Sequence, residues 1–131
     1  MKQITPHNDR LTLARAYMDR HYDAPITLEH ISSEAGFSPY HFIRLFRAAY
    51  RRTPHQYLMQ QRIDKAKDLL RSTDLPIHEI CYTVGFESVG SFTTLFRRIS
   101  GLSPSAYRKF AQRKAQLPFI PFCYRYKLGL D

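Results

Sequence analysis

Two copies of one sequence pattern follow each other along this chain of 131 residues, and this internal repeat limits the folds open to it. The first part of the pattern recurs 49 residues later, where Leu28, Ile31, Ala35, Gly36 and Phe37 correspond to Ile77, Ile80, Val84, Gly85 and Phe86. The second part recurs at a spacing of 50, where Phe42, Leu45, Phe46, Arg47, Thr53, Pro54 and Tyr57 correspond to Phe92, Leu95, Phe96, Arg97, Ser103, Pro104 and Tyr107. The repeat predicts two structural units of the same kind.

The first copy carries the start and stop signals of two short helices. Thr27 can cap a helix through Ala35, and Gly36 allows the positive φ of a sharp turn. Ser38 and Pro39 then start another helix, because serine caps a helix N-terminus and proline is tolerated in the first turn. Each unit is therefore predicted to be a helix-turn-helix.

The remaining signals are also helical, and no stretch shows the sustained alternation of a β-strand. We expect a first helix over 9–21, a long helix from the Thr53–Gln56 capping box to about Arg71, and a short helix from Ser103 through Phe110. The fold is thus predicted to be all-α, with a first helix-turn-helix subdomain at 9–52, a linker helix at 53–72, a second subdomain at 73–112 and a tail at 113–131. The tail is apolar and broken by prolines, and it either folds back onto the domain or forms a contact surface for another protein.

The charge balance indicates a polyanionic partner. Twenty Lys and Arg stand against eleven Asp and Glu, a net charge of +9, which favours nucleic acid first and an acidic membrane surface second. No segment approaches the ~20 apolar residues of a membrane span, and the first ten residues lack the apolar core of a signal peptide. The two cysteines form no CxxC motif. We therefore expect a cytoplasmic, nucleoid-associated protein.

The helix over 38–50 has two unlike faces when its residues are placed about 100° apart around the axis. The apolar face, expected in the core, consists of Phe42, Leu45, Phe46 and Ala49. The opposite face consists of Tyr40, Arg44, Arg47 and Arg51, with Ile43 and Ala48 at its margins. An exposed stripe of one aromatic residue and three arginines on the second helix of a helix-turn-helix suits the major groove of DNA.

The second copy keeps the apolar face but changes the outward one. Its outward stripe consists of Gly90, Thr93, Thr94 and Arg97, with Arg98 at its edge. The arginine fork can donate two hydrogen bonds to one guanine, whereas small groups cannot make that bidentate pair, which is worth ~1–3 kcal/mol of base discrimination. We therefore predict that the first unit supplies most direct base readout and that the second supplies anchoring and a weaker preference for DNA shape.

The second repeat also carries a recognisable family pattern. The run Gly85–Phe86, Phe92, Leu95–Phe96–Arg97, Gly101, Ser103–Pro104 and Tyr107–Arg108 resembles the signature of the AraC/XylS family of bacterial transcription regulators. The resemblance covers about 9–110 and implies seven helices, with two helix-turn-helix subdomains that are joined by a long linker helix and enter successive major grooves. It implies that small members bind DNA as monomers and activate transcription by recruiting RNA polymerase, while larger members add an effector or dimerisation domain.

The positions that match the family imply base contacts from Tyr40, Ile43, Arg44, Gly90, Thr93 and Thr94. Contacts with DNA phosphates are predicted for Ser38, His41, Arg47, Arg51, Ser88, Arg97 and Arg98. Since tandem copies on one chain need no two-fold axis, we expect a monomer on an asymmetric site of ~20 bp, with two contacted segments about one helical turn apart. Arg51 stands where the second repeat has Gly101, so the end of the first recognition helix lacks an easy left-handed cap.

The sequence thus predicts a sequence-specific DNA-binding transcription regulator, more specifically an activator, with double-stranded DNA and RNA polymerase as partners. The alternatives are an architectural or weakly specific DNA-binding protein, or the DNA-binding part of a larger effector-responsive regulator. An enzymatic interpretation compares the chain with DNA alkyltransfer proteins, which carry a reactive, metal-bound cysteine. Cys81 is expected to be packed instead, and the six histidines show no metal-ligand spacing, so we expect no catalysis, metal or cofactor.

Overall fold

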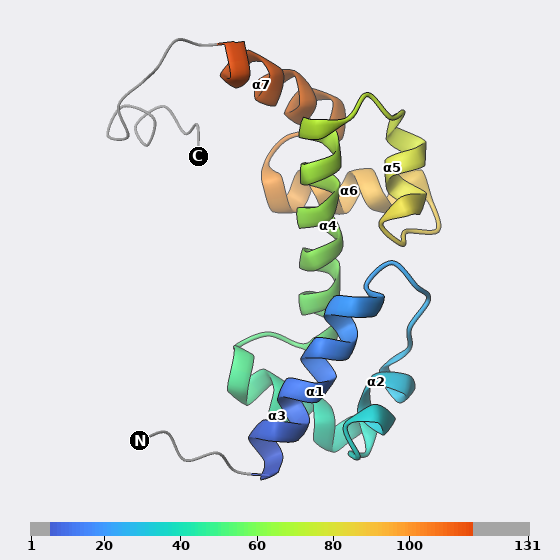
Figure 1. Cartoon of the computed structure of the whole chain (residues 1–131), viewed down its shortest axis with the longest axis vertical. Helices are drawn as coiled ribbons and strands as arrows, with labels where there is room; N and C mark the ends of the chain where they lie inside the picture. Colours follow the sequence, from blue (N-terminus) through green and yellow to red (C-terminus); the bar gives the residue numbers. More distant parts are fainter. Residues whose placement is uncertain (1–5, 117–131) are drawn as a thin grey trace, which may run out of the picture.

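The computed structural model describes residues 6–116, and this part of the chain forms seven helices and no strand (Figure 1). They are α1 (Pro6–His21), α2 (Leu28–Glu34), α3 (Pro39–Tyr50), α4 (Pro54–Ser72), α5 (Ile77–Thr83), α6 (Val89–Ser100) and α7 (Pro104–Gln116). The all-α prediction with seven helices is confirmed. The tail is predicted either to fold back onto the domain or to form a contact surface. Most of it, 117–131, lies outside the described residues.

Polar side chains cap helices at Thr27, Ser38 and Thr53, as the sequence predicts, and also at Ser88, whereas α5 follows Pro76 without a side-chain cap. The hydroxyl groups of Thr27, Ser38 and Ser88 accept hydrogen bonds from backbone N–H groups at the starts of α2, α3 and α6. At α4 the capping box is complete, because Thr53 Oγ1 accepts from the Gln56 N–H at 3.1 Å and Gln56 Oε1 accepts from the Thr53 N–H at 2.9 Å. Each cap satisfies donors that a helix N-terminus leaves open, and typically contributes ~1 kcal/mol.

Three details differ from the sequence prediction. The first helix begins at Pro6 rather than Asp9. The last helix continues to Gln116 instead of ending at Phe110, since 111–116 contain Ala, Gln, Arg and Lys, which favour helix, and no Gly or Pro. The boundary predicted at residue 112 therefore falls inside α7. Ala49, predicted to be in the core, is exposed, because its single methyl group does not reach the core that Tyr50 contacts from the same turn.

Two hydrophobic cores lie along α4, which runs through both units (Figure 1). The first core is formed by Leu11, Ala14, Met18, Ile31, Ala35, Phe37, Phe42, Phe46 and Leu58. The second core is formed by Ile63, Ala66, Leu70, Ile80, Cys81, Val84, Phe86, Phe92 and Phe96. Tyr22 and Met59 are half-buried and pack against both cores. Each fully buried phenylalanine contributes about 1.5–3 kcal/mol to folding, so the phenylalanine pairs of α3 and α6 dominate their cores.

The structure extends the repeat to α1 and α4. The residues Arg10, Leu11, Ala14 and Met18 of α1 correspond, at a spacing of 52, to Arg62, Ile63, Ala66 and Leu70 of α4. The apolar members of both sets are buried in equivalent cores. Because the spacing differs from 49 and 50 and only two of these residues are identical, the sequence comparison missed this part of the repeat. Helix α4 therefore closes the first unit and opens the second.

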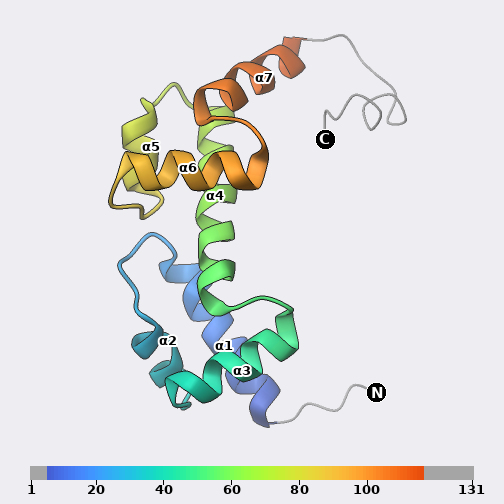
Figure 2. The ribbon, with the colours of Figure 1, turned by 180° about the vertical axis from the view of Figure 1, so that it is seen from behind.

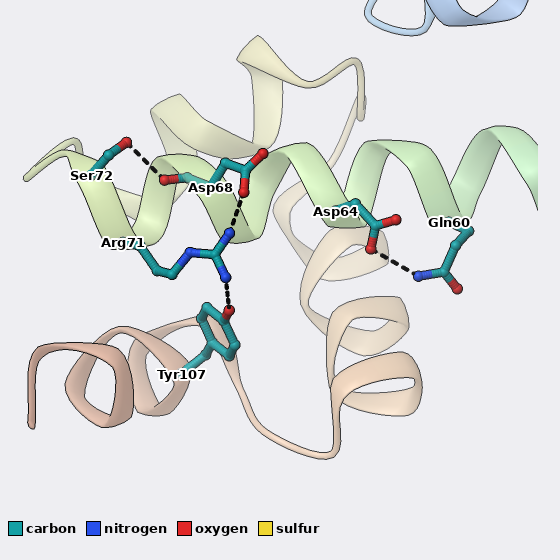
Figure 3. A network of polar contacts seen from close by, with 6 residues as sticks. All are labelled: Gln60, Asp64, Asp68, Arg71, Ser72 and Tyr107. Atoms are coloured by element: carbon teal, nitrogen blue, oxygen red, sulfur yellow. Dashed lines mark hydrogen bonds and ion pairs between the residues drawn. The ribbon is translucent and has the colours of Figure 1, made fainter. Parts of the chain in front are cut away.

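The duplicated cores share one aromatic geometry. The rings of Phe46 and Tyr57 meet edge to face, with centroids 5.6 Å apart and an angle of 76°, and Phe96 and Tyr107 do so at 5.5 Å and 76°. The two hydroxyl groups have different partners, since Tyr57 donates to Asp19 at 2.8 Å whereas Tyr107 accepts from the Arg71 guanidinium at 3.1 Å (Figure 3). Burial and the hydrogen bond to Asp19 raise the pKa of Tyr57 to about 12.

Helix α7 is fastened to the end of α4. The Arg108 guanidinium donates to the backbone oxygens of Leu70 and Thr73, both at 3.2 Å, and so occupies carbonyl groups that the end of α4 leaves open. Figure 3 shows Arg71 between Asp68 of its own helix and Tyr107 of α7. The Arg71–Asp68 ion pair is exposed and contributes little, so the contacts that cross between the two helices carry more weight.

Arg51 is the one non-glycine residue with a positive φ in the described part of the chain. It ends α3 in the left-handed conformation (φ 63°, ψ 18°), and Gly101 ends α6 in the same region (φ 83°). Both caps donate a backbone hydrogen bond to the carbonyl four residues earlier. The first unit thus keeps the turn of the repeat despite the steric cost that a side chain brings there, about 1–2 kcal/mol.

Replacing Arg51 by glycine should stabilise the protein by about 0.5–1 kcal/mol, because glycine removes the left-handed strain and returns part of that gain as entropy of the unfolded chain. The measurement is urea unfolding at low ionic strength without DNA. Gly101→Ala is the matched control and should destabilise by ~1 kcal/mol, since its Cβ meets no atom within 4 Å and adds only the backbone strain. A loss of stability in Arg51→Gly would contradict this interpretation of the cap.

Candidate nucleic-acid interface

In Figure 2, α6 crosses in front of α4 and α3 crosses in front of α1, so the two helices lie on the same face of the molecule, one in each unit. Each is the second helix of its helix-turn-helix, and each follows a turn with a glycine at positive φ, Gly36 at 76° and Gly85 at 105°. Because the turns and caps are equivalent, the two helices present corresponding positions to the solvent.

The outward face of α3 carries an aromatic ring and a row of cations. Tyr40 is 75% exposed, an unusual placement for a large aromatic side chain, and Arg44, Arg47 and Arg51 are all exposed. The exposed stripe predicted for this helix is thus present. Its chemistry combines a flat apolar ring, a hydroxyl group and three guanidinium forks on one side of one helix.

The margin of this stripe is less open. Ile43 is half-buried and lines an apolar cavity of about 320 Å³ together with Pro54 and Leu58 of α4. Ser38 is exposed, but its hydroxyl oxygen accepts a hydrogen bond from the His41 N–H at 3.4 Å. The His41 ring is exposed and stands edge-on to Phe37 at 5.6 Å. Ile43 can therefore offer only part of an apolar side chain, while Ser38 and His41 mark the start of the helix.

The outward face of α6 has smaller side chains. Gly90, Thr94, Arg97 and Arg98 are exposed, and a Cβ on Gly90 would meet no atom within 4 Å. Thr93 is half-buried, and its hydroxyl group donates to the backbone oxygens of Val89 at 2.9 Å and Gly90 at 3.2 Å. The Ser88 hydroxyl caps the helix by accepting from the Ser91 N–H at 3.1 Å. This face therefore offers threonine methyl groups, the exposed side chain of Thr94 and two cations.

A cleft of about 570 Å³ lies between α6 and the first half of α4. Met59, Phe86, Leu95 and Ile99 contribute its apolar lining, and the polar lining consists of Arg52, His55, Gln56, Gln60, Ser91 and Arg98. Arg52 and His55 are exposed side chains that the sequence prediction did not include. Comparison of the repeats did not indicate them, because the counterparts of Arg52 and His55 are Leu102 and Ser105. The adjacent pair Arg51–Arg52 was nevertheless a signal of positive charge in the sequence.

Groups that could support other chemistry are sparse in residues 6–116. This part of the chain holds no cluster of three or more His, Cys, Asp or Glu that could bind a metal ion, and none of its helices is long and apolar enough to cross a membrane. Cys81 is fully buried in the second core, and this burial raises the pKa of its thiol. A buried thiol with a raised pKa is a weak nucleophile, because little of the thiolate forms. The second cysteine, Cys123, lies outside the described residues.

Comparison with known proteins places this arrangement among DNA-binding regulators. A family model described as a helix-turn-helix domain matches residues 31–109. The chain is 34% identical over 100 residues to the probable transcriptional regulator LumQ of Photobacterium leiognathi, covering 76% of this chain and 40% of LumQ. It is 33% identical over 93 residues to the regulatory protein SoxS of Escherichia coli K12, covering 71% of this chain and 87% of SoxS.

A solved structure shares the fold. The DNA-binding domain of AdpA, a global transcriptional factor crystallised with a target DNA, superposes with a TM-score of 0.77 at 31% identity, covering 82% of this chain and 98% of that chain. The chain spans less than half the length of LumQ but most of SoxS. The matched region therefore makes up most of one regulator and less than half of a longer one.

Cys81 should be nearly inert in the folded protein. In a Cys123→Ser variant it is the sole thiol, and a disulfide reagent should modify it at least about 100-fold more slowly in buffer than in denaturant, because reaction requires opening of the second core. Absorbance of the released thiolate follows the reaction. Rapid stoichiometric modification of the folded variant would instead indicate a reactive cysteine and would favour the alkyl-transfer interpretation.

Proposed function

The chain belongs to the AraC/XylS family of DNA-binding transcription regulators, and from that premise we propose how its two units share the recognition of one asymmetric DNA site. The proposal is that α3 and α6 enter successive major grooves on one side of the duplex. One observation carries it: two equivalent helices lie on the same face of the molecule (Figure 2) and expose unlike side chains.

The dimensions of α4 support this geometry. Its 19 residues give a helix of roughly 28 Å, which is comparable to one turn of B-DNA at about 34 Å. The units follow one another along the chain, so no two-fold axis relates them and no palindrome is needed. A monomer therefore suffices for a site with two contacted segments about ten base pairs apart.

The first unit is proposed to carry most of the base recognition. Arg44, in the middle of the exposed stripe, can donate two hydrogen bonds to the O6 and N7 of a guanine. Tyr40 can place its exposed ring against a thymine methyl group and use its hydroxyl for one further hydrogen bond. Ile43 contributes at most an apolar contact from the margin, which its partial burial limits.

The second unit is proposed to contribute weaker base preference. Gly90, Thr93 and Thr94 can approach bases closely, and threonine methyl groups suit thymine. Since the Thr93 hydroxyl already donates to its own helix, Thr94 is the better placed of the two for a polar contact. None of these residues can make a bidentate pair, so preference here depends more on DNA shape.

Phosphate contacts are proposed to set the register of both units. The guanidinium groups of Arg47, Arg51, Arg97 and Arg98 are exposed cations on the two recognition helices. Ser38, His41 and Ser88 stand at the helix N-termini, where the backbone dipole also favours a phosphate. We add Arg52 and His55 to the proposed phosphate contacts, because their cleft lies between the two units. In the proposed complex, this position is close to the DNA backbone between the two contacted major grooves.

The remaining parts of the proposal concern the whole protein. We propose a transcriptional activator that contacts RNA polymerase, acts at the nucleoid in the cytoplasm, and catalyses no reaction. The similarity to SoxS, a regulatory protein that this chain covers along 87% of its length, supports a role for the domain by itself. The partial coverage of LumQ supports the second candidate, the DNA-binding part of a longer regulator.

Selection of bound duplexes from a random pool at 150 mM salt tests the proposal. We expect enrichment of an asymmetric two-part site of about 20 bp, with stronger base preference in the segment that the first unit contacts. A palindromic site would indicate a dimer. Binding without enrichment would favour the architectural alternative, since charge alone gives affinity with little sequence preference.

Alanine substitutions on the two recognition helices separate base recognition from anchoring. Arg44→Ala should lower the ratio of site affinity to random-DNA affinity by about 5–150-fold, the value of one bidentate pair. Arg47→Ala removes the same charge from the same helix and should weaken binding to both DNAs alike, as should Arg97→Ala in the second unit. Fluorescence anisotropy at two salt concentrations gives both affinities. Equal loss of the specificity ratio in Arg44→Ala and Arg97→Ala would contradict the proposed division.

A further inference from the structure

Arg62 is a charged side chain that none of the proposed DNA contacts uses. It lies in the middle of α4, and only 8% of its surface is exposed. Its Nε donates to the backbone oxygen of Tyr22 at 2.6 Å, and its Nη2 donates to that of Ala24 at 2.9 Å. Both carbonyl groups belong to the segment that follows α1, so the guanidinium holds a loop of the first unit.

The other side of the same guanidinium faces the second unit. Its central carbon lies 5.9 Å from the centroid of the Phe86 ring. A Cβ built on Gly85 would stand 2.9 Å from Arg62 Nε and 3.1 Å from the Cα of Asp23. The turn of the second helix-turn-helix is therefore in close contact with both Arg62 and the loop of the first unit, and a side chain at position 85 would have to displace one of them.

Electrostatics act on Arg62 from both units as well. Burial lowers the pKa of Arg62 from its usual value, while the carboxylates of Asp23 in the first unit and Glu87 in the second oppose that change. A buried guanidinium keeps its charge when donors and nearby carboxylates compensate for the lost water. Removing it would take one hydrogen bond from each of two partly buried carbonyl groups and would take the nearby cation from two carboxylates.

The repeat supplies an internal comparison. Arg10 of α1 occupies the position equivalent to Arg62, and its guanidinium carbon lies 5.4 Å from the Phe37 ring centroid, much as Arg62 lies over Phe86. Arg10 is exposed, however, and a Cβ on Gly36 would come no closer to it than 3.8 Å. The stacking on phenylalanine thus belongs to every unit, whereas the burial and the close contact occur only where the two units meet.

We propose that Arg62 is a positioning residue, which together with Gly85 fixes the orientation of the two units and thereby the number of base pairs between the two DNA segments they contact. The inference rests on the proposed two-part recognition. One added base pair turns the second segment by about 35° and moves it by about 3.4 Å relative to the first. A joint that resists this rotation makes binding sensitive to spacing, and a loosened joint tolerates it.

The first test compares Arg62→Met with Arg10→Met on DNA. Duplexes carry the selected site with its spacer unchanged, or lengthened or shortened by one base pair. The unmodified protein and Arg10→Met should lose at least about tenfold in affinity on both altered spacers, whereas Arg62→Met should lose less than about threefold. Methionine keeps much of the side-chain length over Phe86 but donates no hydrogen bond. A folded Arg62→Met protein with the spacing profile of the unmodified protein would overturn the proposal.

A second pair of variants keeps the test decisive if Arg62→Met does not fold. Gly85→Ala and Gly36→Ala carry the same kind of strain, since both glycines have positive φ, but only the Cβ at position 85 presses on Arg62 and Asp23. Gly85→Ala should change the preferred spacing or flatten the profile, and Gly36→Ala should not. Identical profiles for the two alanine variants would overturn the proposal.

A measurement without DNA separates this inference from the proposed function. Spin labels at Glu34→Cys and Thr83→Cys, two exposed and equivalent positions at the ends of α2 and α5, report the distance between units in a Cys123→Ser background. The distance distribution should be narrow in the labelled reference and in Arg10→Met, and at least about twofold broader in Arg62→Met. An unchanged width in a folded Arg62→Met protein counts against the joint. If no DNA site with a spacing optimum exists, the proposed function fails. The spin-label distances then decide by themselves whether Arg62 fixes the orientation of the two units.

Discussion

The continuity of α4 is the constraint on which the rest of the molecule depends. Leu58 on its first half is buried in one core, and Ile63, Ala66 and Leu70 on its second half are buried in the other. A helix is stiff because every turn is hydrogen-bonded to the next, so two cores built on one helix are joined more firmly than a flexible linker would join them. The placement of α3 relative to α6, and hence of the two exposed stripes, follows from this shared helix and from the contacts made across it.

Local features of the fold could be predicted from the sequence because they depend on neighbours in the chain. Thr27, Ser38 and Gln56 cap helices that begin within three residues of them, and Phe42 and Phe46 are buried where the helical period places them. Features that depend on distant segments could not. The burial of Arg62 requires the path of the loop after α1, and the exposure of Ala49 requires knowledge of which neighbours α3 lacks at its last turn.

The candidate interface shows the same division. Helical periodicity was enough to predict that Tyr40 and Arg44 face the solvent, and both do. It was not enough to find the half-buried state of Ile43 and Thr93, or the cationic cleft with Arg52 and His55, because these depend on how closely α4 approaches α3 and α6. Which bases or phosphates these side chains contact stays a prediction, since recognition depends on a partner as well as on the chain.

The polar character of α7 has a consequence for the repeat as a whole. At the spacing of 50 that relates α7 to α4, Arg62 corresponds to Gln112 and Ile63 to Arg113, and both residues of α7 are exposed. Helix α4 can open a second unit because it buries Arg62 against the loop after α1 and Ile63 in the second core, whereas α7 has an exposed charge where Ile63 enters the core. At these two positions α7 therefore offers no apolar surface on which a further unit could pack, just as the polar outer face of a capping repeat offers none in a solenoid.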